Sequence, residues 1–431
     1  MSDDSNRVTT VESLRHRHSL KQLEFVLTSE TPFADLAEEI RNHNDFGGAG
    51  VHDISIVVQS SSSIRINWDD AKSLFAALGE LTQLQSITLT GLSEFPLCRL
   101  TQLLTHIQRA RSLRSIHVRN VQFATTCSST GSKQQEAIEL VAALVHLKRL
   151  HQFEWQERIM DNNSCSVLKQ NFYIWNVIFR QSQLEYVCLQ ETSGQPSSTT
   201  NTILGQIVRR DAVEKLCDSP RLEELTLFHF CIGAHALTGM AHKLCTNRNL
   251  RVLNLDLRFT GPPGIMALWN MLQTNESINT CELWIPSGST ASLPHLAQCL
   301  TRNTTLLVLV LKSSNTSAIC AVSDKDARAF VTLLEGNPFG PITLDLDQYT
   351  GQYAPLIQLH THLNVERNTD ESLVLAASPE TVTQTIWNWL LLTAVTAEKP
   401  VSSLYRFNAM FQILLQYPTV MTDWNTIDAM A

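Results

Sequence analysis

Two short segments place paired histidines where a metal ion could be bound. His16 and His18 are two residues apart, and so are His360 and His362. Imidazole nitrogens are common zinc ligands. Neither pair has cysteines or carboxylates nearby at ligand spacing, so the sequence favours polar surface residues. We assign no metal ligand.

Two other segments contain residue types found in phosphate-binding or acid–base sites, but neither lies in the structural context that such a site needs. The Gly-rich stretch 46–50 precedes a strand pattern, whereas a phosphate-binding loop follows a strand and opens a helix. Asp345 and Asp347 alternate on one strand, and paired carboxylates can do acid–base work. Without a pocket or partner base, two acids favour a solvated face. We therefore expect no catalytic or cofactor-binding residues, no cofactor, and a protein that is not an enzyme.

The strongest pattern in the chain is a leucine-based repeat from Leu222 to Leu311. Four segments share the apolar spacing of positions 1, 4 and 6, and their first residues are 28 residues apart. They begin at Leu222, Leu250, Ile278 and Leu306. A fixed period of this size predicts a solenoid, in which each unit buries its apolar side against its neighbours.

The same spacing continues on both sides of this region with less regular intervals. It begins earlier at Leu20, Val51, Leu84, Leu113, Leu150 and Leu184, and later at Phe339 and, more weakly, at His360. Between these segments lie amphipathic helix patterns such as 236–244, 265–272 and 293–300. Each helix pattern ends in Leu-x-x-Asn, at Asn247, Asn275, Asn303 and Asn337, where an asparagine could adopt the left-handed helix-closing conformation.

The repeating unit is therefore a strand, a loop, a helix and a loop. Strands connected through helices must be parallel. Strands lie about 4.8 Å apart, whereas helices are about 10 Å wide, so helices stacked beside the strands take the outer, convex layer. We expect an α/β curved solenoid of about 11–12 irregular repeats over 20–366, with a parallel sheet on the concave face, after an N-terminal extension at 1–19.

This pattern resembles the leucine-rich-repeat family. The 28-residue period and the Leu-x-x-Asn-x-x-Leu junction are similar to its ribonuclease-inhibitor-like class. The resemblance implies a protein that mediates contacts with other proteins. Members of the family usually carry Asn or Cys three residues after the third apolar position. Here that place holds residues such as Leu92, Phe230 and Pro286, so we expect the usual polar ladder to be largely missing and the curvature to be uneven.

Two other folds alternate strands and helices, and the strand pattern opposes both. Doubly wound sheets and (β/α)8 barrels cover both faces of their strands, which then read as continuous apolar runs. Most strands here alternate, as in Leu225-Thr226-Leu227 and Leu253-Asn254-Leu255. About a dozen such segments also exceed the eight of a barrel.

Residues between the apolar strand positions should face the concave surface. They include exposed aromatic side chains with acidic residues among them. The predicted partner-binding residues are Tyr186, Glu224, Phe228, Asp256, Glu282 and Trp284. Exposed aromatics rimmed by charge are typical of interaction sites, and an acidic rim favours a protein partner with a basic segment. The alternative, that the aromatics pack against the following loops, remains open.

The amino-acid composition restricts the functional classes and the cellular locations that fit this chain. Hydrophobic residues make up 43% of the chain, enough to bury a core. With a net charge of −8, the chain lacks the excess of basic residues that is typical of nucleic-acid-binding proteins. The ten cysteines are scattered without zinc-finger spacing, as expected of reduced thiols. No apolar run suits a signal peptide or a membrane span. We expect a cytoplasmic location, with a nuclear one possible, and no membrane partner. The Asn-x-Ser/Thr triplets at Asn275 and Asn303 are expected by chance.

The C-terminal region 367–431 changes character. Residues 381–395 and 403–417 read as apolar and amphipathic helices. Solenoids need end caps, so a helical cap is the simpler interpretation, and a docking pair for another protein is the alternative.

The sequence thus predicts a non-enzymatic interaction scaffold. The alternative is a recognition or regulatory subunit of a larger assembly, ubiquitin-ligase-like or immune-receptor-like, recruited through these helices. Nothing in the sequence indicates an oligomeric state.

Overall fold

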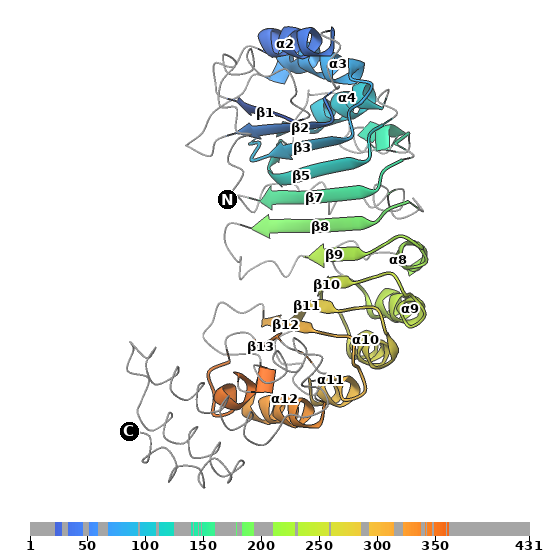
Figure 1. The fold of residues 1–431 in the computed structure, drawn as a ribbon, viewed down its shortest axis with the longest axis vertical. Helices are drawn as coiled ribbons and strands as arrows, with labels where there is room; N and C mark the ends of the chain where they lie inside the picture. The colour runs from blue at the N-terminus through green and yellow to red at the C-terminus, as the bar shows by residue number, and fades with distance from the viewer. Residues whose placement is uncertain are drawn as a thin grey trace, which may run out of the picture. The chain divides into compact units, whose positions relative to one another are not determined.

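The chain forms two compact units, Met1–Cys231 (unit 1) and Ile232–Ala431 (unit 2) (Figure 1). The computed structural model describes residues 22–27, 33–45, 51–58, 68–93, 95–108, 112–124, 139–159 except 141, 145 and 148, 178, 183–193, 210–228, 232–257, 260–285, 293–313, 322–337, 341, 343–346, 349–358 and 360–361. Within that part, no helix combines the length and hydropathy needed to cross a bilayer.

Unit 1 contains parallel strands in the sheet order β1-β2-β3-β5-β7-β8-β9, together with a short parallel pair, β4-β6. Its strands are β1 (Gln22–Leu27), β2 (Asp53–Val58), β3 (Ser86–Thr90), β4 (Phe95–Pro96), β5 (Ser115–Val121), β6 (Phe123–Ala124), β7 (Gln152–Ile159), β8 (Tyr186–Ser193) and β9 (Glu224–Phe228). Its helices are α2 (Phe33–Asp45), the 3-10 helix η1 (Trp68–Ala71), α3 (Lys72–Glu80), α4 (Leu97–Ile107) and α8 (Arg210–Cys217). Helices α2, α3 and α4 pack in succession beside the strands (Figure 1).

Unit 2 repeats the arrangement with the parallel strand order β10-β11-β12-β13. Its elements are α9 (Ala234–Leu244), β10 (Val252–Asp256), α10 (Pro262–Thr274), β11 (Thr280–Ile285), α11 (Leu293–Leu300), β12 (Val308–Ser313), α12 (Asp324–Gly336) and β13 (Thr343–Leu346). Helices α9 to α12 form one row, each packed on the next (Figure 1). The close approach of α9 and α10 requires Gly264, since a Cβ there would lie 2.8 Å from Ala234 Cα.

Each leucine-based segment of the sequence from Leu20 to Phe339 corresponds to one of these strands. The strand pairs of the described residues are all parallel, in agreement with helical connections. Residues 360–361 are helical, and the rest of the weak candidate at His360 lies outside the described residues, so that strand stays a prediction. The α/β class and an open stack of parallel strands are thus observed, while the tail 367–431 lies outside the described residues.

Alternation along the strands separates two faces. In β11 the burial alternates strictly, with Cys281, Leu283 and Ile285 buried. Helix α10 contributes Leu268 and Leu272, both fully buried, to the same core. We call the other side of the strands, which carries the residues between the buried ones, the open face. It is the surface on which the sequence placed the candidate binding residues.

A row of aromatic rings runs through the core of unit 1. Trp68 contacts Phe33 and Phe95 with ring centroids 5.8 and 4.5 Å apart, and Phe95 lies 6.2 Å from Phe123. Phe123 stacks on Trp155 at 5.2 Å. Such pairs add to the free energy that burial of the rings already contributes. The row therefore links successive repeats from α2 to β7.

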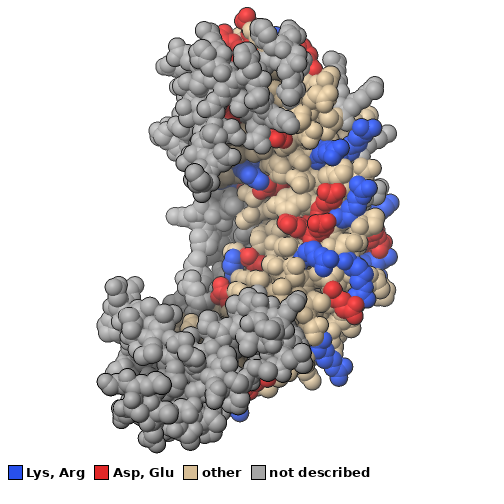
Figure 2. Space-filling view, in the orientation of Figure 1, with Lys and Arg blue, Asp and Glu red and all other residues tan. Residues whose placement is uncertain are grey.

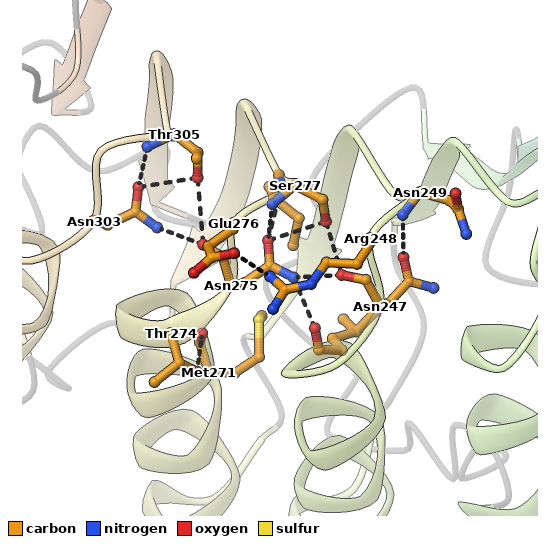
Figure 3. Close-up of polar contacts among 12 residues, drawn as sticks. Asn247, Arg248, Asn249, Met271, Thr274, Asn275, Glu276, Ser277, Asn303 and Thr305 are labelled. Atoms are coloured by element: carbon orange, nitrogen blue, oxygen red, sulfur yellow. Dashed lines mark hydrogen bonds and ion pairs between the residues drawn. The ribbon is translucent and has the colours of Figure 1, made fainter.

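Buried asparagines join the repeats of unit 2 (Figure 3). Asn275 Nδ2 donates to the Leu244 carbonyl at 2.7 Å, and its Oδ1 accepts from the Ile278 amide at 2.8 Å. Asn303 repeats both bonds one unit later, to Leu272 and from Leu306. Each side chain thus satisfies backbone groups of two adjacent repeats that would otherwise be buried without partners.

This ladder corrects the expectation that its asparagines close the helices in the left-handed conformation. Asn275 and Asn337 do not adopt the left-handed conformation, because their φ angles are −74° and −124°. Their function is side-chain bridging between turns. A polar ladder is present, at the helix-to-strand junction instead of the place where the family usually has it. In the Asn-x-Ser/Thr triplets the asparagines are buried, and Ser277 and Thr305 hydroxyls donate to the Asn247 and Asn275 carbonyls, so the triplets are structural turns.

Candidate binding face

The open face of unit 1 holds a charged cluster centred on a buried carboxylate. Glu154 of β7 is 3% exposed. Its Oε2 accepts from Arg119 Nε at 2.8 Å and lies 2.9 Å from His117 Nδ1. Its Oε1 accepts from Gln156 Nε2 at 2.7 Å. The strand register explains the meeting, because His117 pairs with Glu154 across β5 and β7.

The ion pairs keep Glu154 ionised despite its burial. Burial, the largest single effect, raises the pKa of this carboxyl group, but the hydrogen bonds and Coulombic interactions with His117 and Arg119 together outweigh it, so the pKa lies below its ordinary value. The same pairing raises the pKa of the Arg119 guanidinium. An ionised carboxylate inside the sheet face, hydrogen-bonded to a guanidinium, an imidazole and an amide, links the side chains of β5 and β7 in this register.

This cluster makes unit 1 sensitive to acid. A carboxyl group with a lowered folded-state pKa contributes stability above its unfolded pKa, here about 4.5, and loses it as the pH falls through the folded value. We expect Glu154→Gln to lower the free energy of unfolding by about 1.5–3 kcal/mol at pH 7, since it removes charged hydrogen bonds. Urea unfolding at pH 7 and at pH 3.5 checks this: the gap between wild type and variant should narrow in acid. An equal gap at both pH values contradicts it.

Tyr186 and Cys188 of β8 border the cluster. Burial raises the pKa of the Tyr186 phenol, so it stays neutral, and burial raises the pKa of the Cys188 thiol to about 11. Tyr186 is half-buried, and Glu224, its neighbour in the register with β9, is exposed. These two predicted residues therefore do lie at the surface of unit 1.

In unit 2 the open face carries a second set of linked side chains. Trp284 Nε1 of β11 donates to Glu282 Oε1 at 3.2 Å. Lys312 Nζ of β12 binds the same oxygen at 2.6 Å and lies 5.9 Å from the Trp284 ring centroid. The register aligns Trp284 with Lys312, which brings the ammonium group over the indole. All three side chains remain partly exposed.

Two of the predicted residues are not exposed, and the expectation that they lie open to a partner is wrong. Phe228 is 9% exposed and Asp256 is 1% exposed. Side chains in register on neighbouring parallel strands stand about 4.8 Å apart, so a large side chain covers a smaller one. Asp256 is in register with the larger Trp284. Glu154, which also stands between apolar strand positions, is buried as well.

The sequence did not indicate that His117, Arg119 and Lys312 are the partners of the carboxylates in these two clusters. His117 and Arg119 occupy alternate positions between the buried Ile116, Val118 and Val121, so strict alternation in β5 would have placed them on the open face. Alternation in β12 likewise places Lys312 on the open face, but its bond to Glu282 depends on the register of β11 and β12. Figure 2 shows Lys and Arg side chains interspersed with Asp and Glu side chains among the described residues on the face in view.

No group of three or more His, Cys, Asp or Glu side chains that could hold a metal gathers among the described residues. His295 of α11 lies 3.2 Å from Asn270 Oδ1 and 3.5 Å from Cys299 Sγ. Burial raises the pKa of Cys299, which favours its neutral thiol. A thiolate nucleophile needs the opposite shift, so this Cys-His-Asn contact is packing between α10 and α11.

Comparisons with known proteins give a fold likeness of limited extent. No family model and no curated protein matches the sequence. Among solved structures, leiomodin-1 actin-binding site 2 aligns at 19% identity and a TM-score of 0.31, covering 38% of this chain and 91% of that one. A Caenorhabditis elegans tropomodulin C-terminal domain aligns at 8% identity and a TM-score of 0.29, covering 37% and 95%. Likeness at this level carries no argument about partners.

Proposed function

We propose that this protein is a non-enzymatic interaction scaffold that binds a protein partner on the open face of its strands. The observation that carries the proposal is the set of Glu282, Trp284 and Lys312. A tryptophan is kept partly exposed there, held at its ring nitrogen by Glu282 and at its ring face by Lys312. Tryptophan is enriched among the residues that dominate binding energy at protein interfaces.

Unit 1 offers a smaller candidate contact. Tyr186 and Glu224 are at the surface, and Tyr186 lies beside the ordered Glu154 cluster. A tyrosine that stands on a rigid base loses little conformational entropy on binding. Phe228 and Asp256 are not proposed as contacts, because both are buried; they support the strands from within.

Several finer expectations belong to this proposal. They are the ribonuclease-inhibitor-like class of leucine-rich repeat, the curvature of each strand ribbon, and a cytoplasmic or nuclear location. The second prediction from the sequence, recruitment into a larger assembly through C-terminal helices, concerns 367–431, outside the described residues. Parallel strands joined by helices support the leucine-rich-repeat assignment of the described units.

Truncation of the exposed indole tests the function. Trp284→Ala should weaken capture of the partner from an extract of the source cells by about thirtyfold, as loss of a hot spot of about 2 kcal/mol does. The matched control is Lys325→Ala, at an exposed position of α12. Quantitative affinity purification measures both. Partner recovery that is equal for the two folded variants would show that the binding face lies elsewhere.

A further inference from the structure

The geometry of the Trp284 set points to the chemistry of the partner. Building on the function proposed above, we propose that Glu282 and Trp284 form a recognition site for an arginine side chain of the partner, and that Lys312 is an internal occupant which this arginine displaces. Lys312 Nζ already binds as such a cation would, 2.6 Å from Glu282 Oε1 and 5.9 Å from the indole centroid.

The charges around the site favour a cation. Asp256 is the register neighbour of Trp284, and Asp345 of β13 is the register neighbour of Val310 on the same face. Asp256 is buried, so the carboxyl groups near Lys312 in the register that are at least partly exposed are those of Glu282 and Asp345, two for one ammonium group. This excess of acidic groups attracts a positively charged segment and raises its association rate.

The interaction of Lys312 with this site is weak. Its side chain is 41% exposed and that of Glu282 is 23% exposed. An ion pair this open to water contributes at most a factor of about five to an equilibrium. Displacing Lys312 into solvent is therefore a small obstacle, and after displacement its charge remains hydrated.

An arginine fits the vacated place better than a second lysine does. A guanidinium group is planar, stacks on an indole ring and presents two parallel N–H donors that match a carboxylate. Lys312 and Trp284 Nε1 both bind Oε1 of Glu282, and Oε2 is the second acceptor that a fork-shaped donor requires. The site thus distinguishes the two cations by shape as well as by charge.

A small probe tests this site without knowledge of the partner. The probe is capped arginine, N-acetyl-arginine amide, titrated into the full chain labelled with ¹⁵N-tryptophan. The Trp284 indole N–H resonance, identified by its loss in Trp284→Phe, reports occupancy. We expect Lys312→Met to lower the half-saturating concentration about fivefold relative to wild type. Capped lysine should bind Lys312→Met more weakly than capped arginine does.

Removal of the carboxylate provides the second arm. Adding Glu282→Gln to Lys312→Met should abolish the response to capped arginine, and the urea midpoint shows whether each variant is folded. Lys312→Gln replaces Lys312→Met if that variant unfolds. Equal half-saturation in wild type and Lys312→Met, or binding that survives Glu282→Gln, overturns the arginine proposal. If capped arginine fails while Trp284→Ala still loses the partner, the binding face stands and only its chemistry is wrong.

Discussion

Asn275→Ala should lower the free energy of unfolding by about 2–4 kcal/mol. The side chain is 2% exposed, and its amide group donates to the Leu244 carbonyl while accepting from the backbone amides of Ser277 and Ile278. Alanine leaves these backbone groups buried without partners, which costs more than the net value of the bonds themselves. Equilibrium urea unfolding, followed by circular dichroism, measures the loss.

An exposed asparagine provides the control for effects that any Asn→Ala substitution has on stability. Asn249 is exposed, and Asn249→Ala should stay within about 0.5 kcal/mol of wild type. Asn303→Ala should behave like Asn275→Ala, because Asn303 makes the corresponding bonds to Leu272 and from Leu306. If Asn275→Ala is as stable as Asn249→Ala, the ladder does not join the repeats energetically.

Trp155→Ala should destabilise unit 1 by about 3–5 kcal/mol, the range for removing a large aromatic side chain from a core. Trp155 is 1% exposed, stacks on Phe123 at 5.2 Å and lies 6.0 Å from Phe153. Its truncation opens a cavity at the β7 end of the aromatic row, where rigid β-strands limit collapse. Thermal and urea unfolding by circular dichroism measure the change without depending on tryptophan emission.

The control for the aromatic row keeps a ring at the same position. Trp155→Phe preserves stacking on Phe123 but loses the ring nitrogen's bond to Glu157 Oε1 at 3.2 Å. It should cost about 1–2 kcal/mol, mostly from the lost bond and the smaller ring. A phenylalanine variant as unstable as the alanine variant would argue that hydrogen bonding, and not the row of rings, stabilises this part of the core.

The strands could be predicted from the sequence because the signal is local. In Leu253-Asn254-Leu255 and Cys281-Glu282-Leu283, alternation alone separates the buried positions from those between them, and the 28-residue period then stacks the strands. The helices between them follow from apolar spacing in the same way. The buried positions of a strand or helix depend on residues a few positions apart, so the sequence of one repeat is enough to predict them.

The candidate site was harder to predict because it depends on neighbours in different repeats. Asp256 has the alternation of an exposed residue, yet it is buried, and only the register with Trp284 indicates a large neighbour. Glu154 meets Arg119 across a sequence separation of 35 residues. The asparagines were found from their spacing, but their bonds to the preceding repeat were not, since a helix end does not show what lies beside it.

Photo-crosslinking from the open face tests the central claim most directly. Benzoylphenylalanine is placed at Val310, which lies on the open face between Glu282 and Asp345 in the register, or at the exposed Lys325 of α12. Irradiation in an extract of the source cells should yield a protein adduct from position 310 that excess wild-type protein suppresses, and none from position 325. A suppressible adduct from position 325, with none from position 310, would contradict binding on the open face.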